Sequence, residues 1–462
     1  MKGDFLRALH VLANGPPDVN GYAIRTHSIL RSQNELDEID PTALTSPWYP
    51  DRISMKDDFE LDRIKYLRTK HPIYAEKNNF FEKIVKVFTP KRNHKEETKQ
   101  KTKTIINRSK KIITLTMKPI KLMFKLYEEK VLIRTFTKKI TSVAKEIDAE
   151  IIHAHTPYRV GFPALLASRK LGIPFVYEVR GLWEDTAVAN GRWTENGLVY
   201  RRFRRKETFL MSNADAVVCI SEALKQDLVE RGIEPNKIVV VPNGIEPHLL
   251  EHGQDKISHA EVLEFEQKRL DTVTIGYIGS LRKLEGVDYT AEAVSILQKK
   301  GYNVRFFVLT GLSGQKELLS YCRKLGISDN TLIFGPVPHD EVAGYYDLID
   351  LFVVSRPKFR VTDLVTPLKP YEAMFHEKPI IAADLLAFRE IIEHGVTGLL
   401  YTPDDVNSLA KTLERCINEE GLIQQLSSAG KTWVLGQRSW DKLAIRYSQL
   451  YKTIIKGSEL ND

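Results

Sequence analysis

A proline-containing loop that leads into a helix offers the most specific chemistry in this chain. Residues Leu351–Val354 form an apolar run that is typical of a buried parallel strand. A basic loop follows, ends in Thr366-Pro367-Leu368-Lys369, and continues into a helix that begins near Pro370. The first N–H groups of a helix have no partner and lie at the positive end of its dipole, so we expect this end to bind phosphate. Glu372, in the first turn, is placed to accept hydrogen bonds from ribose hydroxyls. Together these residues predict a site for a nucleotide diphosphate.

A glycine loop after another predicted strand, Val273–Ile278, has the same character. Gly279 and Ser280 follow that strand directly, and glycine lets backbone amides approach a phosphate closely because it has no Cβ. Arg282 lies in the same loop. We expect Arg282 and Lys369 to stabilise the charge of a bound diphosphate. Four further cations in these loops are the alternatives: Lys283, Arg356, Lys358 and Arg360.

The first half of the chain offers a second set of cleft residues. In doubly wound sheets, the loops after the carboxyl ends of the strands form the cleft. A turn-rich loop follows the predicted strand 6–12 and ends at Gly21, where a helix begins with Tyr22. We expect both residues to face this cleft. The alternative is an ordinary turn rich in glycine and proline.

The loop after the predicted strand 174–179 combines acids, an arginine and a tryptophan. Arg180 could bind a phosphate or a carboxylate, while Glu178 or Glu184 could orient an acceptor, with Trp183 beside them. A buried salt-bridge network that braces the loop is an equally good interpretation.

Two histidines alternate on the predicted strand 150–155 and therefore share one face. His155 is nearer the carboxyl end of the strand, so we expect it at the cleft. His153 is the better candidate for a core histidine.

The order of motifs resembles the retaining glycosyltransferases of family 4, which have the GT-B fold. The pieces that carry the resemblance are Glu372-Ala373-Met374, Glu377-Lys378-Pro379-Ile380, Phe388-Arg389-Glu390, Gly395-Val396-Thr397-Gly398-Leu399-Leu400 and the segment 212–245. The pattern Glu178-x-Arg180-x-x-Trp183-Glu184 resembles a polysaccharide-associated branch. The resemblance implies two doubly wound, Rossmann-like parallel-sheet domains that face a cleft, α/β throughout. It also implies sugar transfer from a nucleotide diphosphate sugar, without a metal or another cofactor. With that reaction, Arg282 and Lys369 would stabilise the leaving diphosphate. The acceptor-side residues would be Gly21, Tyr22, His155, Trp183 and Glu184.

The chain departs from the family pattern at three positions. Ser280 and Glu285 stand where the family commonly has Arg and Lys, and Leu364 stands where it often has the first of two glutamates, with Asp363 beside it. Gly335–His339 should line the base pocket, and the resemblance favours UDP. The expected donor-binding residues are Gly279, Ser280, Val337, Asp363, Thr366, Pro367, Leu368, Lys369 and Glu372.

A length of 462 residues favours two domains. Alternating strands and helices predict an N-terminal acceptor-side domain over 1–250 and a nucleotide-sugar domain over 270–437, joined by the polar stretch 252–271. The helix over 438–462 should cross back to the N-terminal domain, as the resemblance implies.

A basic segment over about 50–147 interrupts the N-terminal domain. Between residues 80 and 146 there are 19 Lys or Arg and 6 Asp or Glu, a net charge of +13 in a chain whose total is +8. Large apolar residues are interleaved, and the part over 51–74 suits a helix. One interpretation is a helical surface that binds anionic membranes. The other is an insertion packed on the N-terminal domain with a solvated Lys face. Nucleic-acid binding is disfavoured because no RNA or DNA motif is present.

The three cysteines are far apart and lack metal-ligand spacing, which favours a reducing compartment and predicts no metal site. No run of eighteen apolar residues is present, and the first residues do not resemble a signal peptide. We therefore expect a cytoplasmic enzyme that can lie peripherally at the inner face of the membrane. It should transfer a hexose or N-acetylhexosamine to a lipid-linked or growing surface polysaccharide. Glycosylation of a soluble small molecule, formation of a disaccharide, and a non-catalytic nucleotide-sugar-binding scaffold are the alternatives.

Overall fold

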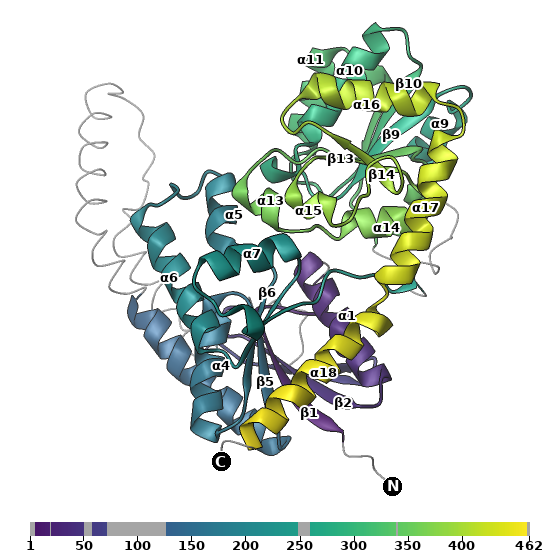
Figure 1. Cartoon of the computed structure of the whole chain (residues 1–462). Coiled ribbons are helices and arrows are strands. Elements are labelled where there is room, and N and C mark those ends of the chain that lie inside the picture. The colour runs from purple at the N-terminus through teal and green to yellow at the C-terminus, as the bar shows by residue number, and fades with distance from the viewer. Residues whose placement is uncertain are drawn as a thin grey trace, which may run out of the picture.

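The computed structural model describes residues 5–18, 20–49, 58–71, 126–247, 259–338 and 341–459. They form two α/β domains, each built on one sheet, with the last helix returning to the first domain (Figure 1). Of the expected basic segment over about 50–147, residues 50–57 and 72–125 lie outside the described residues.

The N-terminal domain is built on an eight-stranded sheet of order β3-β4-β2-β1-β5-β6-β7-β8, parallel except for the β3–β4 pair. Its strands are β1 (Leu6–Leu12), β2 (Ile39–Thr45), β3 (Phe59–Leu61), β4 (Ile64–Arg68), β5 (Ile151–His155), β6 (Phe175–Val179), β7 (Ala216–Cys219) and β8 (Ile238–Val240). Its helices are α1 (Gly21–Glu35), residues 126–146, α4 (Tyr158–Leu171), α5 (Trp183–Ala189), α6 (Leu198–Asn213) and α7 (Glu222–Glu230), with the 3-10 turn η1 (Pro235–Lys237).

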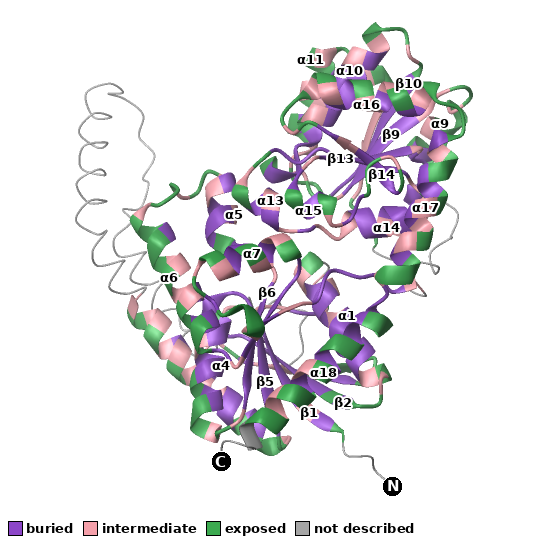
Figure 2. Ribbon diagram, viewed as in Figure 1, coloured by how far each residue is buried: buried purple, intermediate pink, exposed green. Residues whose placement is uncertain are grey.

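Alternate residues of the strands divide the core of this domain into two layers. Leu6 and Ala8 pack under α1 and the C-terminal helix α18 (Trp440–Glu459), whereas Leu9 and Val11 pack under α4 and α6. Figure 2 shows the sheet as a buried layer between these helices. The period of two in a strand produces this division.

The prediction of a helix over 51–74 is wrong for residues 59–68, which form β3 and β4. Ile64 and Tyr66 are buried while Lys65 between them is exposed, which is the alternation of a strand. At the other end of the expected insertion, helix 126–146 buries Leu132 and Phe136 in the core of the domain. The described ends of the basic segment are therefore part of the domain and do not form an added surface element.

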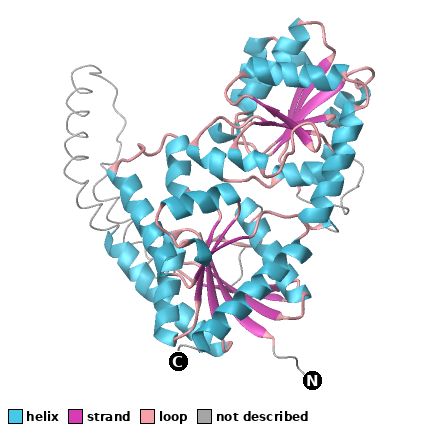
Figure 3. Ribbon diagram, viewed as in Figure 1, coloured by secondary structure: helices cyan, strands magenta, loops and turns pink. Residues whose placement is uncertain are grey.

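The C-terminal domain has a fully parallel sheet of order β11-β10-β9-β12-β13-β14. Its strands are β9 (Val273–Ile278), β10 (Val304–Leu309), β11 (Thr331–Phe334), β12 (Leu351–Val354), β13 (Ile380–Ala383) and β14 (Gly398–Tyr401). Its helices are α9 (Ala260–Gln267), α10 (Val287–Lys299), α11 (Gln315–Leu325), α12 (Val342–Tyr346), α13 (Arg360–Leu364), α14 (Lys369–Phe375), α15 (Leu386–Arg389), α16 (Val406–Asn418) and α17 (Leu422–Gln437), with 3-10 turns η2 (Lys283–Glu285) and η3 (Ser328–Asn330). The alternation of helices and strands is visible in Figure 3.

Two helices, α9 and α18, lie where the chain passes from one domain to the other. Helix α9 lies within the polar stretch that we expected to be a connection, and its Val262 is buried in the C-terminal core. Helix α18 leaves the C-terminal domain and packs along α1, where Trp440 and Tyr447 are buried in the N-terminal core. The expected return of the last helix is thus what the structure has (Figure 1).

Candidate active site between the domains

A cavity of about 1000 Å³ lies between the two domains. It is lined by residues that follow β1 and β6 on one side and β9 and β12 on the other, so the carboxyl ends of both sheets face it. Eight charged side chains line it: Arg25, Arg180, Arg192, Arg282, Arg356, Lys369, Glu285 and Glu372. Six cations against two acids favour an anionic ligand.

The loop before α14 and the first turn of that helix form one wall. The Nζ of Lys369 lies 2.7 Å from Oε2 of Glu372, and the hydroxyl of Tyr346 donates to the same oxygen at 3.0 Å. Asn243, from the N-terminal side, donates to the carbonyl of Thr366 at 2.9 Å. The wall is therefore held from both domains, with Glu372 already oriented.

The side of the cavity formed by the C-terminal domain is called the donor wall. Its other part is a cluster of two arginines around one acid. Glu285 is buried and accepts from Arg356 Nε at 2.9 Å and from Arg282 Nη2 at 2.7 Å. Gly286 follows with a φ of +63°, and a Cβ there would overlap the carbonyl oxygen of Ser355, so only glycine fits. The cluster adds one net positive charge to the cavity wall beside Gly279.

Arg180 faces the cavity but is already engaged on its other side. Its Nε donates to Glu178 Oε1 at 2.8 Å, its guanidinium also bonds Thr26 and His155, and it lies 4.9 Å from the ring centroid of Tyr22. Burial alone would raise the pKa of Glu178, but Arg180 and the neighbouring cations hold that pKa well below its usual range. Arg180 therefore holds α1 and Tyr22 in place, with the anionic Glu178 beneath it.

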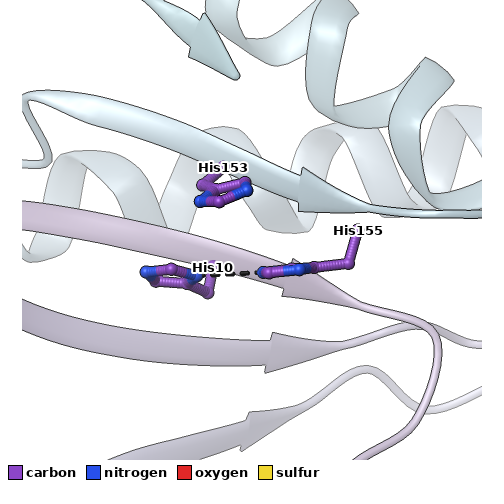
Figure 4. Close-up of side chains that lie close together, drawn as sticks. All are labelled: His10, His153 and His155. Atoms are coloured by element: carbon purple, nitrogen blue, oxygen red, sulfur yellow. Dashed lines mark hydrogen bonds between the residues drawn. The ribbon is translucent and has the colours of Figure 1, made fainter. Parts of the chain in front are cut away.

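Three buried histidines lie beneath Arg180, on the strands β1 and β5 (Figure 4). Nδ1 of His10 and Nε2 of His155 are 3.0 Å apart, and one nitrogen of each of His10, His153 and His155 lies within 4.8 Å of the others. By distance alone they could hold a metal ion. Arg180 bonds His155, however, and burial lowers the pKa of His10 and His155 well below the ordinary value. Such a cationic neighbour opposes an added cation, so we interpret the cluster as neutral, hydrogen-bonded imidazoles.

The structure brings most of the predicted residues to one cavity. Those that line it are Gly21, Tyr22, Arg180, Trp183, Gly279, Ser280, Arg282, Val337, Thr366, Pro367, Leu368, Lys369 and Glu372. Four predicted residues do not line it: His155 and Glu178 lie under Arg180, Glu184 pairs with Arg231 at 2.9 Å, and Asp363 accepts from the N–H of Leu386 at 2.9 Å. The direct acceptor or donor contacts expected of these four do not fit their positions.

Sequence reasoning missed several residues that shape the cavity. Arg25 is 2% exposed and donates to Glu178, to Asn243 and to backbone carbonyls. Arg25 lies inside helix α1, where the signal that identified the others is absent. Asn243 follows β8 and directly precedes Gly244, so the same signal was present there and could have identified it. Glu285 appeared only as a departure from a pattern, and its role becomes visible through its partners.

Two family models match the chain. One, described as Glycosyltransferase Family 4, covers residues 84–249, and the other, Glycosyl transferases group 1, covers residues 260–433. The chain belongs to glycosyltransferase family 4. A similar protein of known name is the capsular polysaccharide biosynthesis glycosyltransferase CapM of Staphylococcus aureus, 24% identical over 67% of this chain and 78% of CapM.

Solved structures confirm the GT-B fold of this family-4 chain. A sucrose-phosphate synthase from Thermosynechococcus elongatus matches with a TM-score of 0.70 at 14% identity, over 98% of this chain and all of that one. Anabaena HepE in complex with UDP matches with a TM-score of 0.64 at 15% identity, over 97% of this chain and all of HepE. Among the described residues, no helix combines the length and the apolar character that a membrane span requires.

Proposed function

We propose that this glycosyltransferase moves a hexose or N-acetylhexosamine from a UDP-sugar to a lipid-linked or growing surface polysaccharide, with retention and without a metal. It would work in the cytoplasm, at the inner face of the membrane. The observation that carries the proposal is the cationic cavity, in which the Thr366–Lys369 loop and Glu372 face the N-terminal residues Tyr22 and Trp183. A donor bound by the C-terminal wall would present its sugar to an acceptor on the N-terminal wall.

The charges of the cavity support a metal-independent donor site. Glu285 and Glu372 are the acids that line it, and each already pairs with a cation. Arg282, Arg356 and Lys369 are placed to stabilise the leaving diphosphate in the way a metal would. The family pattern has Arg and Lys where this chain has Ser280 and Glu285. Arg282 and Arg356, from neighbouring loops, supply positive charge in their place.

In this reaction some group must accept the proton of the acceptor hydroxyl. Transfer breaks the bond between the anomeric carbon and a phosphate oxygen, forms a bond to the acceptor oxygen, and releases the proton of the acceptor hydroxyl. Glu178 and His155 are covered by Arg180, so neither reaches the cavity. The phosphate oxygen of the leaving group is therefore the proton acceptor we propose, which keeps the new bond on the face from which the donor leaves.

The relatives support the acceptor class. CapM is named for capsular polysaccharide biosynthesis, and another relative, 23% identical over 58% of this chain and 59% of its own, is an alpha-monoglucosyldiacylglycerol synthase from Streptococcus pneumoniae. A relative with a small-molecule name, the alpha-D-kanosaminyltransferase of Streptomyces kanamyceticus, is 22% identical over 61% of this chain and 72% of its own. This relative supports glycosylation of a soluble small molecule as the second candidate function.

A thermal-shift screen of nucleotide sugars, followed by a transfer assay, tests the proposal. A bound donor at a hundred times its dissociation constant adds roughly 2.7 kcal/mol to the free energy of unfolding, so UDP-sugars should raise the melting temperature more than GDP- or ADP-sugars. Transfer should persist in EDTA and give a product with the anomeric configuration of the donor. Donor binding without hydrolysis or transfer would instead support a non-catalytic scaffold.

A further inference from the structure

Helix α6 presents an unusual exposed row on the N-terminal domain. Leu198, Arg202, Arg205 and Phe209 are spaced four, three and four residues apart, so they lie on one side of the helix. All four are exposed, with 87% of Leu198 and 50% of Phe209 accessible. The row therefore has an apolar side chain at each end and arginines between them.

The charge of this helix has one sign on its surface. Residues Leu198–Asn213 contain four arginines and one lysine, and the single acid, Glu207, is buried and bonds Tyr177 and the N–H of Tyr158. An ordinary solvated helix face has acids among its bases. No acid of α6 lies on this face, and Glu129 of helix 126–146 offsets only part of its charge, so the row keeps a net positive charge that suits an anionic partner.

A neighbouring helix extends the basic surface. Glu129 of helix 126–146 pairs with Lys206 at 2.5 Å and with Arg202 at 3.3 Å, which places the two helices side by side. That helix exposes Tyr127, which is 63% accessible, and the bases Lys130 and Arg134. The chain's own residues 72–125 carry 15 Lys or Arg and 4 acids, so by charge they are not the complement of the arginine row.

We propose that the α6 row docks on an anionic lipid bilayer. Arginines beside exposed leucine and phenylalanine suit a membrane surface, where the bases meet anionic headgroups and the apolar side chains enter the interface. A nucleic acid would use the arginines but would leave Leu198 without a partner. The row also lies close to the site along the chain, because α6 follows α5 and the cavity-lining Arg192 by a short loop. Docking there sets the acceptor side of the cavity beside the lipid, which deepens the proposed function.

Co-sedimentation of the whole protein with vesicles, without nucleotide sugar, tests the docking surface. Phosphatidylcholine vesicles that contain phosphatidylglycerol should bind the protein, pure phosphatidylcholine vesicles should not, and salt should weaken the binding. Each arginine at an anionic surface is worth roughly a fivefold change in partitioning, so Arg202→Gln with Arg205→Gln should lower it roughly 25-fold. Leu198→Ser with Phe209→Ser should lower it too, at low and at high salt.

Matched controls come from the C-terminal domain. Arg323→Gln with Lys324→Gln removes the same charge from exposed positions of α11, and Leu270→Ser with Leu312→Ser removes two leucines that are 84% and 75% exposed. Both should bind as the unmodified protein does. As a second readout, Leu198→Trp should shift its fluorescence to the blue with anionic vesicles.

Three results would overturn the proposal: no vesicle binding, equal binding to both kinds of vesicle, or α6 variants that bind as the controls do. Capture of RNA with the same dependence on Arg202 and Arg205 and no vesicle binding would point to a nucleic acid instead. Because the assay contains no donor and measures no transfer, each of these outcomes leaves the proposed activity standing, whereas loss of transfer alone leaves the docking surface standing.

Discussion

The arginine cluster around Glu285 gives the sharpest test of the donor wall. The side chain of Arg356 is 9% exposed and that of Arg282 is 54% exposed, although both pair with the same acid. A buried cation acts in a medium of lower dielectric and is screened less than an exposed one. Removing a preorganised group that stabilises developing charge costs about 2–4 kcal/mol. We therefore expect Arg356→Ala to lower kcat/KM about 30- to 1000-fold, and Arg282→Ala to lower it about fivefold or less.

The fold should survive the Arg356 substitution, because Glu285 keeps Arg282 as a partner. Initial rates with a UDP-sugar, beside a thermal melt, would separate lost chemistry from lost structure. Lys358→Ala is the matched control: this exposed residue lies in the same loop but does not line the cavity. If Arg356→Ala and Lys358→Ala gave rates within twofold of each other, the cluster would not face the diphosphate and Lys369 would be the remaining cation of that wall.

Three further predictions follow from the contacts of the site. Glu372→Gln should raise the KM for the nucleotide sugar about tenfold or more with little change in melting temperature, because charged hydrogen bonds are worth about 1.5–3 kcal/mol, and an unchanged KM would contradict its role toward ribose. Asn243→Ala should lower kcat because it removes the N–H that donates to the Thr366 carbonyl. Asn243→Asp should lower it further, because it also places a carboxylate oxygen against that carbonyl oxygen; equal rates in the two variants would exclude this. Burial lowers the pKa values of His10 and His155 below the ordinary 6.5, so the unfolded chain takes up protons at a higher pH than the folded chain does. The free energy of unfolding should therefore fall as the pH drops below about 6.5. The fall should be steeper than in a His155→Gln variant. Denaturant melts from pH 8 to 5 would measure it, and parallel pH profiles would refute it.

The strands of the C-terminal domain could be predicted almost to the residue. Apolar runs such as Leu351–Val354 are buried on both faces, so their pattern is local and strong. The second strand of the N-terminal sheet, Ile39–Thr45, was missed because Asp40 and Pro41 interrupt the apolar pattern. Its pairing with β1 and β4 stabilises it, and such pairing is not visible in a short window.

The site could be located from the sequence but its charges could not be assigned. Loops at the carboxyl ends of parallel strands converge, so naming Gly279, Lys369 and Tyr22 required only strand order. Which cations remain available for a ligand depends on partners that are distant in sequence. For Arg180 the sequence left two interpretations open, a ligand contact and a salt-bridge network that braces the loop. Its guanidinium bonds Glu178, His155, Thr26 and the carbonyl of Tyr22.

Glu178 explains why the returning C-terminal helix matters to a site that it does not line. Tyr447 of α18 donates to Glu178 Oε2 at 3.0 Å, while Arg25 of α1 bonds Oε1 at 3.1 Å. The same Arg25 donates to Asn243, whose amide holds the carbonyl of Thr366 in the donor wall. A continuous set of hydrogen bonds, most of them to charged groups, thus runs from α18 through the N-terminal domain to the loop before α14. A buried polar group that loses its hydrogen-bond partner destabilises the fold. Helix α18 therefore helps to fix the position of the loop before α14 relative to the N-terminal side of the cavity.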